Sequence, residues 1–235
     1  LAFYMGLASM SLAEATSIFF VSPLLITIFS AFFLREHVGM RRWIAVVVGL
    51  LGVVIIMRPG TELFRFASIL PLIAALAYAL VQVSTRVVGR TEKASTMAFY
   101  IQVTFIVVCS AVGLGIGDGR YASGINPSID FLFRAWIVPP FGDLLLMGGI
   151  GCFMGVGTYL IFQGYRLTEA SLVAPFEYIG IPLAVFWSIV VFHDYPDALV
   201  WVGIVLIVGA GIYIVYRESI RGRKELFSDP MPRNR

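Results

Sequence analysis

Long apolar runs are the feature that most limits what this chain can fold into. A helix that crosses a lipid bilayer needs about 20 mostly apolar residues. Runs of this kind predict eight spans, at 1–12, 15–34, 43–57, 67–88, 95–117, 143–165, 170–192 and 198–216. Charged residues make up only 13% of the 235-residue chain, against about 25% in average soluble domains. Because lipid offers no hydrogen-bond partner to backbone groups, the sequence predicts an all-α integral membrane protein, a polytopic helical bundle.

Basic residues orient these spans. If the loop from Arg35 to Arg42 faces the cytoplasm, all but four of the seventeen Lys and Arg residues fall on that side. Cytoplasmic loops of membrane proteins carry such an excess. We therefore expect a multi-pass protein of the bacterial inner (plasma) membrane with its basic tail, residues 219–235, in the cytoplasm. The long loop 118–142 then lies outside, as a connector, with a partly ordered lid as the alternative.

Two segments of the chain resemble each other. Glu14 in "AEATSIFFVSP" aligns with Glu169 in "TEASLVAPFEY", and after a short insertion Glu36 aligns with Asp194. The first three spans therefore match the last three, and the repeat unit has five spans. Because five is odd, the two units enter the membrane in opposite senses. Inverted repeats of this kind are typical of secondary transporters, whose solute site lies near the bilayer midplane between the halves.

The repeat also predicts the domain organisation. Residues 1–60 form the last three spans of a first unit, residues 61–218 form a complete second unit, and residues 219–235 form the tail. The chain starts at Leu1, inside an apolar run. We therefore expect an N-terminally truncated sequence, with eight spans visible and ten in the full-length protein.

Both segments resemble a known family. Residues 12–60, "LAEATSIFFVSPLLITIFSAFFLREHVGMRRWIAVVVGLLGVVIIMRPG", look like the first repeat of the EamA family in the drug/metabolite transporter superfamily. Residues 169–218, "EASLVAPFEYIGIPLAVFWSIVVFHDYPDALVWVGIVLIVGAGIYIVYRE", look like the second. The resemblance implies ten helices in an inverted repeat around a central cavity for a small metabolite. It leaves the substrate and the direction of transport open.

Glu177 is the most unusual residue within the spans. It stands in "APFEYIGIP", between Pro175 and Pro182, eight residues after Glu169. That places it about 12 Å along a helix, well inside the apolar layer. A charge at such a depth is costly unless it faces water, finds a partner or takes a proton, and no Lys or Arg stands at matching depth. We predict that Glu177 contacts solute or exchanges protons, with packing against a neighbouring helix as the alternative.

Helix breaks and polar side chains complete the candidate site. Ser22 aligns with Glu177 and Pro23 with Tyr178, so both units are predicted to break at a polar position. The candidate substrate-binding or coupling residues are Glu177, Tyr178, Ser22, Gln82, Tyr78, Gln102, Tyr159 and Gln163, and the helix breaks are Pro23, Pro175 and Pro182. Taken singly, each of these polar residues is expected to hydrogen-bond another helix more often than to contact a solute. For Tyr178, a position in the cavity and a position at a helix interface are equally expected. Together they favour a solute recognised by stacking and neutral hydrogen bonds over a polyanion.

Several classes of site have no motif in this chain. There is no carboxylate pair or His cluster with metal-ligand spacing and no phosphate-binding loop, so we expect no metal, no cofactor and no ATP-driven pump. No nucleic-acid partner is expected either. The glycine pairs Gly113/Gly117 and Gly151/Gly155 favour close packing of helices within the chain over packing between two copies. A homodimer remains an alternative.

The leading functional hypothesis is a secondary active transporter. It would move a small metabolite across the membrane by alternating access, with proton coupling as an added hypothesis. The expected partners are a small-molecule solute and the lipid bilayer, and no enzyme activity is expected. One alternative is a non-transporting membrane scaffold. The other, an intramembrane enzyme acting on a lipid-linked substrate, is disfavoured because the acidic residues are scattered.

Overall fold

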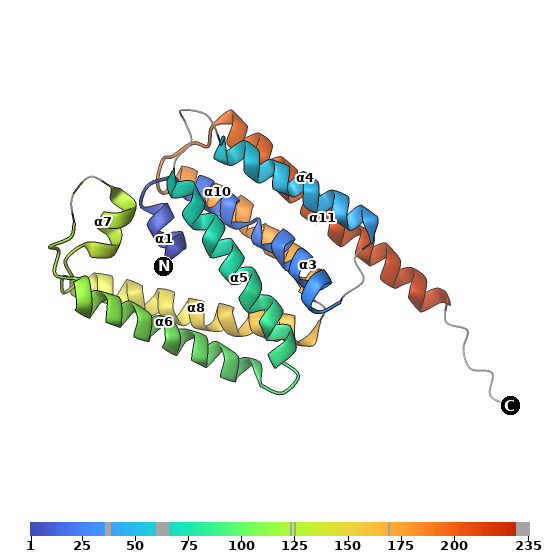
Figure 1. Cartoon of the computed structure of the whole chain (residues 1–235), viewed down its shortest axis with the longest axis horizontal. Coiled ribbons are helices and arrows are strands. Elements are labelled where there is room, and N and C mark those ends of the chain that lie inside the picture. Colours follow the sequence, from blue (N-terminus) through green and yellow to red (C-terminus); the bar gives the residue numbers. More distant parts are fainter. Residues whose placement is uncertain (36–38, 60–65, 123, 125, 169, 229–235) are drawn as a thin grey trace.

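The chain folds as a bundle of helices, and the computed structural model describes residues 1–35, 39–59, 66–122, 124, 126–168 and 170–228. Glu36, Glu169 and residues 229–235 of the expected tail therefore lie outside the described residues. Every regular element within the described ranges is helical. In chain order these are α1 (Ala2–Leu7), α2 (Leu12–Phe19), α3 (Ser22–Phe33), α4 (Met40–Met57), η1 (Phe66–Ser68), α5 (Ile69–Val88), α6 (Ala94–Ile116), α7 (Pro127–Phe133), α8 (Phe141–Leu167), α9 (Ala170–Val173), η2 (Ala174–Ile179), α10 (Gly180–Val190) and α11 (Ala198–Ser228) (Figure 1).

All eight apolar segments predicted as spans fall on helices. Among the described residues, four helical segments are long and apolar enough to cross a membrane: Leu12–Phe33, Phe66–Val88, Ala94–Ile116 and Phe141–Leu167. Shorter apolar helices cover three more segments, at Trp43–Met57, Phe176–Val190 and Ala198–Ile214. The prediction of an all-α membrane fold is confirmed, although α1, with six residues, is too short to span a bilayer alone.

The predicted span 15–34 is two helices rather than one. The break lies at Phe20 and Val21, between α2 and α3. Pro23 explains it, because proline has no N–H to donate to the carbonyl one turn earlier and its ring clashes with that carbonyl. In the structure Pro23 sits in the first turn of α3, where a backbone N–H needs no intrahelical partner.

The predicted span 170–192 is also divided. It comprises the single turn α9, the 3-10 helix η2 and the regular helix α10. Pro175 lies at the start of η2 and Pro182 in the first turn of α10. Two prolines so close together remove two backbone donors, and the tighter 3-10 turns between them carry Glu177.

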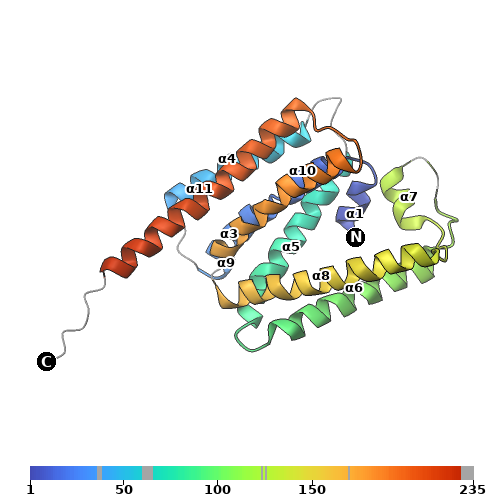
Figure 2. The same cartoon turned by 180° about the vertical axis from the view of Figure 1, so that it is seen from behind.

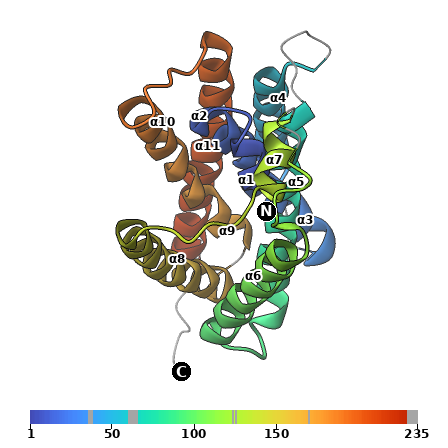
Figure 3. The ribbon, with the colours of Figure 1, turned by 90° about the vertical axis from the view of Figure 1, so that its left-hand side faces the viewer.

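The long loop is more ordered than a connector. Residues Pro127–Phe133 form α7, and the Asn126 side chain caps it by accepting a hydrogen bond from Ser128 N at 3.2 Å. The hydroxyls of Ser128 and Ser9 lie 2.5 Å apart, so α7 packs beside α1 (Figure 3). This part of the loop therefore holds a short helix, and its role as a connector or as a lid stays a prediction.

The helices lie in three layers (Figures 1 and 2). The pair α4 and α11 forms one outer layer, the pair α6 and α8 forms the other, and α3, α5 and α10 lie between them. One apolar core joins α2, α4, α10 and α11 through fully buried side chains such as Ile18, Ile56 and Ile207. A second core, which contains Tyr165 and Ala174, joins α3, α5, α8 and α9 and lies beside the predicted site.

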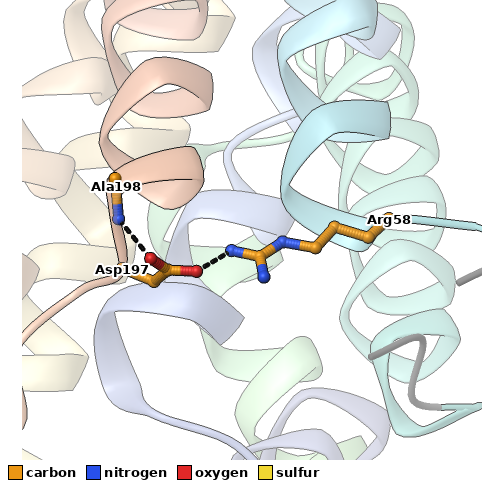
Figure 4. A network of polar contacts seen from close by, with 3 residues as sticks. All are labelled: Arg58, Asp197 and Ala198. Carbon is orange, nitrogen blue, oxygen red and sulfur yellow. Dashed lines mark hydrogen bonds and ion pairs between the residues drawn. The ribbon is translucent and has the colours of Figure 1, made fainter. Parts of the chain in front are cut away.

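Helices α4 and α11 make the most extensive helix contact and run antiparallel. Gly52 and Gly203 meet within it, because a Cβ atom on Gly203 would lie 2.7 Å from the carbonyl oxygen of Gly52. Further along the same pair, Arg58 meets Asp197 (Figure 4). An antiparallel arrangement of the final helices of the two expected units is what an inverted repeat requires.

The ion pair between Arg58 and Asp197 ties the end of α4 to the start of α11 (Figure 4). Asp197 Oδ1 also accepts a hydrogen bond from Ala198 N at 2.6 Å. The hydrogen bond from Arg58, and then that from Ala198, hold the pKa of Asp197 below its ordinary value. The charged form of Asp197 is therefore favoured in the folded protein.

Replacing Asp197 by asparagine is expected to lower the melting temperature slightly at neutral pH, because the Asp197 side chain is 61% exposed. A lowered folded-state pKa means that the pair stabilises the fold above the unfolded-state pKa of about 3.9 and that this stabilisation is lost as the pH falls below it. The gap between wild type and Asp197→Asn should therefore close in acid. Asp118→Asn is the matched control, since Asp118 pairs with Arg120 inside one loop. If the difference in melting temperature between wild type and Asp197→Asn persisted in acid, the charge of Asp197 would not be what stabilises this contact.

The two glycine pairs behave differently. A Cβ atom on Gly113 would lie 1.7 Å from the Trp136 ring, and one on Gly117 would lie 3.0 Å from it. Packing within the chain is therefore confirmed for the pair on α6. On α8, nothing lies within 4 Å of a Cβ atom added at Gly151 or Gly155, so the same prediction is wrong for that pair within the described residues.

Candidate functional site

Glu177 is held by two tyrosine hydroxyls. Tyr78 donates a hydrogen bond to Glu177 Oε1 at 2.9 Å, and Tyr165 donates to the same oxygen at 2.7 Å. Tyr165 is fully buried, whereas Glu177 and Tyr78 are half-buried. No cationic side chain in the described ranges pairs with Glu177. The carboxylate is therefore fixed by neutral donors rather than by an ion pair.

Three elements bring these groups together. Tyr78 lies in the middle of α5, Tyr165 near the end of α8, and Glu177 in the 3-10 helix η2. Long side chains on a helix point back toward its N-terminus. The Tyr165 hydroxyl therefore reaches from the end of α8 toward the interior of the bundle, where it meets the acid.

Tyr165 was missed by the sequence analysis. Tyr165 is the last residue of the predicted span 143–165 and is not among the candidate site residues. One general rule indicates its position: a long side chain at the C-terminal end of a helix points back toward the N-terminus of that helix, and so into the bundle. The spacing of 12 residues between Tyr165 and Glu177 indicates a contact across the turn that joins two consecutive spans.

Tyr178 lies at a helix interface. Its ring is 6.4 Å from the ring of Phe20, at the break between α2 and α3. On the other side it packs on α11, where a Cβ atom added at Gly211 would lie 2.0 Å from the Tyr178 ring. The two helix breaks are thus adjacent in space, and a Cβ atom on Gly180 would lie 2.3 Å from the Phe20 ring.

Gln82 and Ser22 are buried beside this arrangement. Gln82 follows Tyr78 by one turn of α5 and its side chain interacts with the Tyr78 hydroxyl. Ser22 is the first residue of α3, which contacts both α5 and η2. Gln82 Oε1, Ser22 Oγ and the Tyr178 hydroxyl are buried and have no hydrogen-bond partner among the described residues. Buried polar atoms without a partner call for an explanation.

The other three candidates are not joined to Glu177. Gln102 is half-buried on α6, and on α8 Gln163 is half-buried while Tyr159 is 42% exposed. No hydrogen bond in the described part of the chain links any of them to the acid. Of the eight candidates, the structure links Tyr78, Gln82 and Glu177 through side-chain contacts, with Ser22 and Tyr178 on neighbouring segments.

Two cavities lie away from Glu177. One, of about 510 Å³, is an apolar groove between α10 and α11 that includes Pro182, Phe186 and Trp201. The other, of about 500 Å³, lies between the α1–α2 turn and the His193–Asp194 turn. The described residues contain no group of three His, Cys, Asp or Glu side chains that could hold a metal ion.

The arrangement around Glu177 suits reversible contact rather than bond chemistry. A half-buried carboxylate with two hydroxyl donors on one oxygen can accept a proton or a donor group from a solute on the other. Residues Phe19 and Phe20 add aromatic faces, and the Phe19 ring lies 5.4 Å from that of Tyr78. Acid, hydroxyls and rings together form a polar cluster with aromatic side chains beside it.

The sequence matches a family of membrane proteins. Residues 1–58 match the model of the EamA-like transporter family. This agrees with the resemblance drawn from the repeat segments.

Curated bacterial relatives are named as transporters. A "Riboflavin transporter" of Vibrio cholerae is 29% identical over 90% of this chain and 65% of its own length. An "S-adenosylmethionine uptake transporter" of Rickettsia bellii is 25% identical over 91% of this chain and 67% of its own length. A "Riboflavin transporter" of Rhizobium johnstonii is 26% identical over 93% of this chain. The chain spans about two thirds of the length of these relatives.

One solved crystal structure shares the fold. It matches with a TM-score of 0.61 and 20% identity, over 92% of this chain and 72% of that chain. Together with the apolar helices, these likenesses identify a multi-pass membrane protein.

Proposed function

Because residues 1–58 match the EamA-like transporter family and the curated relatives are named as transporters, we propose that this chain moves a small metabolite across the bacterial inner membrane as a secondary active transporter. The names of its relatives support this proposal, since they are riboflavin and S-adenosylmethionine transporters. Both of those solutes contain a planar nitrogen heterocycle and several hydrogen-bonding groups. A solute of this kind would suit the hydroxyls, amides and aromatic rings around Glu177.

The observation that carries the proposal is the position of Glu177. The acid stands on a break in an apolar segment, half-buried and hydrogen-bonded by Tyr78 and Tyr165. Discontinuous helices with polar groups at the break are a common way to build a transporter site. A scaffold would gain nothing from an acid in such a position, because an ionisable group within a membrane is costly.

The unpartnered buried atoms extend the proposed site. Gln82 Oε1 and Ser22 Oγ can each accept a hydrogen bond, and the Tyr178 hydroxyl can donate one. They belong to α5, α3 and η2, elements of both expected repeat units. Polar groups of a bound solute would satisfy them, and this is the role we propose for these three residues.

The two repeat units and the membrane orientation belong to the same proposal. Residues 1–60 and 61–218 would rock against each other, with the antiparallel α4 and α11 pair between them as the pivot. The excess of basic residues supports a cytoplasmic tail. A protease added to the outside of intact cells should leave a C-terminal epitope tag uncut, and cleavage of that tag would contradict this orientation.

Uptake by reconstituted vesicles tests the proposed function. Purified protein in phospholipid vesicles should take up radiolabelled riboflavin or S-adenosylmethionine faster than protein-free vesicles do. Uptake should saturate with solute concentration, because a carrier has a limited number of sites. Rates equal to those of protein-free vesicles for these solutes and for a wider metabolite panel would overturn the proposal.

Proton coupling is an additional part of the proposal. Glu177 lies within a predicted membrane segment and has no charged partner among the described residues. Acidic residues within membrane segments often serve as proton relays. If it carries the coupled proton, a pH gradient should accelerate uptake by wild type but not by Glu177→Gln. Full gradient-driven uptake by the Glu177→Gln protein would end this role.

A further inference from the structure

The nearest basic side chains on the supporting helices are turned away from Glu177. Arg166 follows Tyr165 directly on α8, but its Nε donates to the carbonyl oxygens of Gly89 and Glu92, both at 3.0 Å. Arg86 lies two turns beyond Tyr78 on α5, and its Nη1 donates to the carbonyl oxygen of Arg166 at 3.0 Å. These contacts tie the end of α8 to the α5–α6 loop, and among the described residues the acid has no countercharge.

The two oxygens of Glu177 are also unequal. Both tyrosine hydroxyls donate to Oε1, and Oε2 receives no hydrogen bond from the described part of the chain. Glu177 as a whole is half-buried, so one side of the carboxylate stays open. A carboxylate prefers several donors, and the open oxygen has a place for one more.

Aromatic rings belong to the residues beside Glu177, namely its donor Tyr78 and its chain neighbour Tyr178. Tyr78 lies against Phe19 with ring centroids 5.4 Å apart, and Phe20 lies 6.4 Å from Tyr178. The electron-rich faces of aromatic rings attract cations and stack on planar groups. A carboxylate oxygen that has no donor, together with aromatic rings on the neighbouring residues, is a suitable combination for recognising an organic cation.

We infer that this site selects solutes that carry a positive charge next to a planar or apolar group, with Glu177 as the residue that determines this preference. The inference rests on the proposed function and names its substrate class. Attraction between charges is much stronger in a partly dehydrated site than in water. A preference of about ten-fold corresponds to about 1.4 kcal/mol, which is a small part of the attraction between two unit charges in contact in such a site.

A matched pair of probes tests the inference by binding alone. S-adenosylmethionine carries a positively charged sulfonium, and S-adenosylhomocysteine lacks only that methyl group and the sulfonium charge, because both keep the same ammonium and carboxylate groups. Dissociation constants for both, measured by titration calorimetry on the purified full chain, should favour the cation by about ten-fold or more in wild type. In Glu177→Gln the ratio should fall toward parity. Because no transport is measured, a failed uptake assay would overturn the proposed function without deciding this inference.

Three variants separate charge from folding. Glu177→Asp keeps the charge and should keep the preference for the cation. Glu92→Gln makes the same charge change at an exposed residue and should leave the ratio unchanged. Melting temperatures of all variants show which of them are folded. Equal binding of both probes by wild type, binding of neither, or an unchanged ratio in Glu177→Gln would each overturn the inference.

Discussion

Adding one methyl group at Gly203 is expected to lower the free energy of unfolding by about 1–3 kcal/mol. The Cβ atom of Gly203→Ala would lie 2.7 Å from the carbonyl oxygen of Gly52 and 2.4 Å from Ile56 Cγ1. Separations under 3.0 Å do not occur for real Cβ atoms, so something must shift. The obstacle includes the backbone of α4, and the two helices would therefore have to move apart along their whole contact.

Gly209→Ala is the matched control on the same helix. Nothing lies within 4 Å of a Cβ atom at Gly209, and alanine favours a helix over glycine by about 0.8–1.0 kcal/mol. This variant should be neutral or slightly more stable than wild type. Thermal or denaturant unfolding of the purified proteins in detergent gives the comparison. Equal stability of Gly203→Ala and Gly209→Ala would mean that α4 and α11 do not cross where the structure places them.

The helical segments could be predicted because their cause is local. A run of about 20 apolar residues has to become a helix in lipid, whatever its neighbours are. The break before α3 also has a local cause, since Pro23 alone disturbs the preceding turn. The short helix α7 carried a local signal as well, because Asn126, Pro127 and Asp130 form a typical helix start.

The site could be predicted only in part, because a sequence shows which residues are polar and not where they point. Glu177 stands out in an apolar run on composition alone. Its partnership with Tyr78 and Tyr165 depends on how α5, α8 and η2 cross, which is a tertiary property. The same limit explains Gln102, Tyr159 and Gln163, which are polar residues of the right kind on helix faces that do not meet the acid.

Removing both tyrosine hydroxyls should have the largest effect at the site itself. Tyr78→Phe and Tyr165→Phe each delete one donor to Glu177 Oε1 and keep the ring. A hydrogen bond to a charged group is worth about 1.5–3 kcal/mol. The two effects should not be additive. Once one hydroxyl is removed, the other is the one remaining hydrogen-bond donor to Glu177 among the described residues. We expect a coupling of about 0.5–3 kcal/mol between the two substitutions.

A double-mutant cycle of unfolding free energies measures that coupling. Tyr159→Phe is the control, since Tyr159 is 42% exposed on α8 and donates no hydrogen bond to Glu177. Additivity within about 0.5 kcal/mol would show that the two hydroxyls do not share one oxygen.

Repeating the cycle in Glu177→Gln makes the test specific to charge. There the acceptor is a neutral amide oxygen, so the coupling should shrink to the level of ordinary hydrogen bonds, about 1 kcal/mol or less. A coupling of the same size in both backgrounds would mean that the tyrosines stabilise helix packing and that the charge on Glu177 has no part in it.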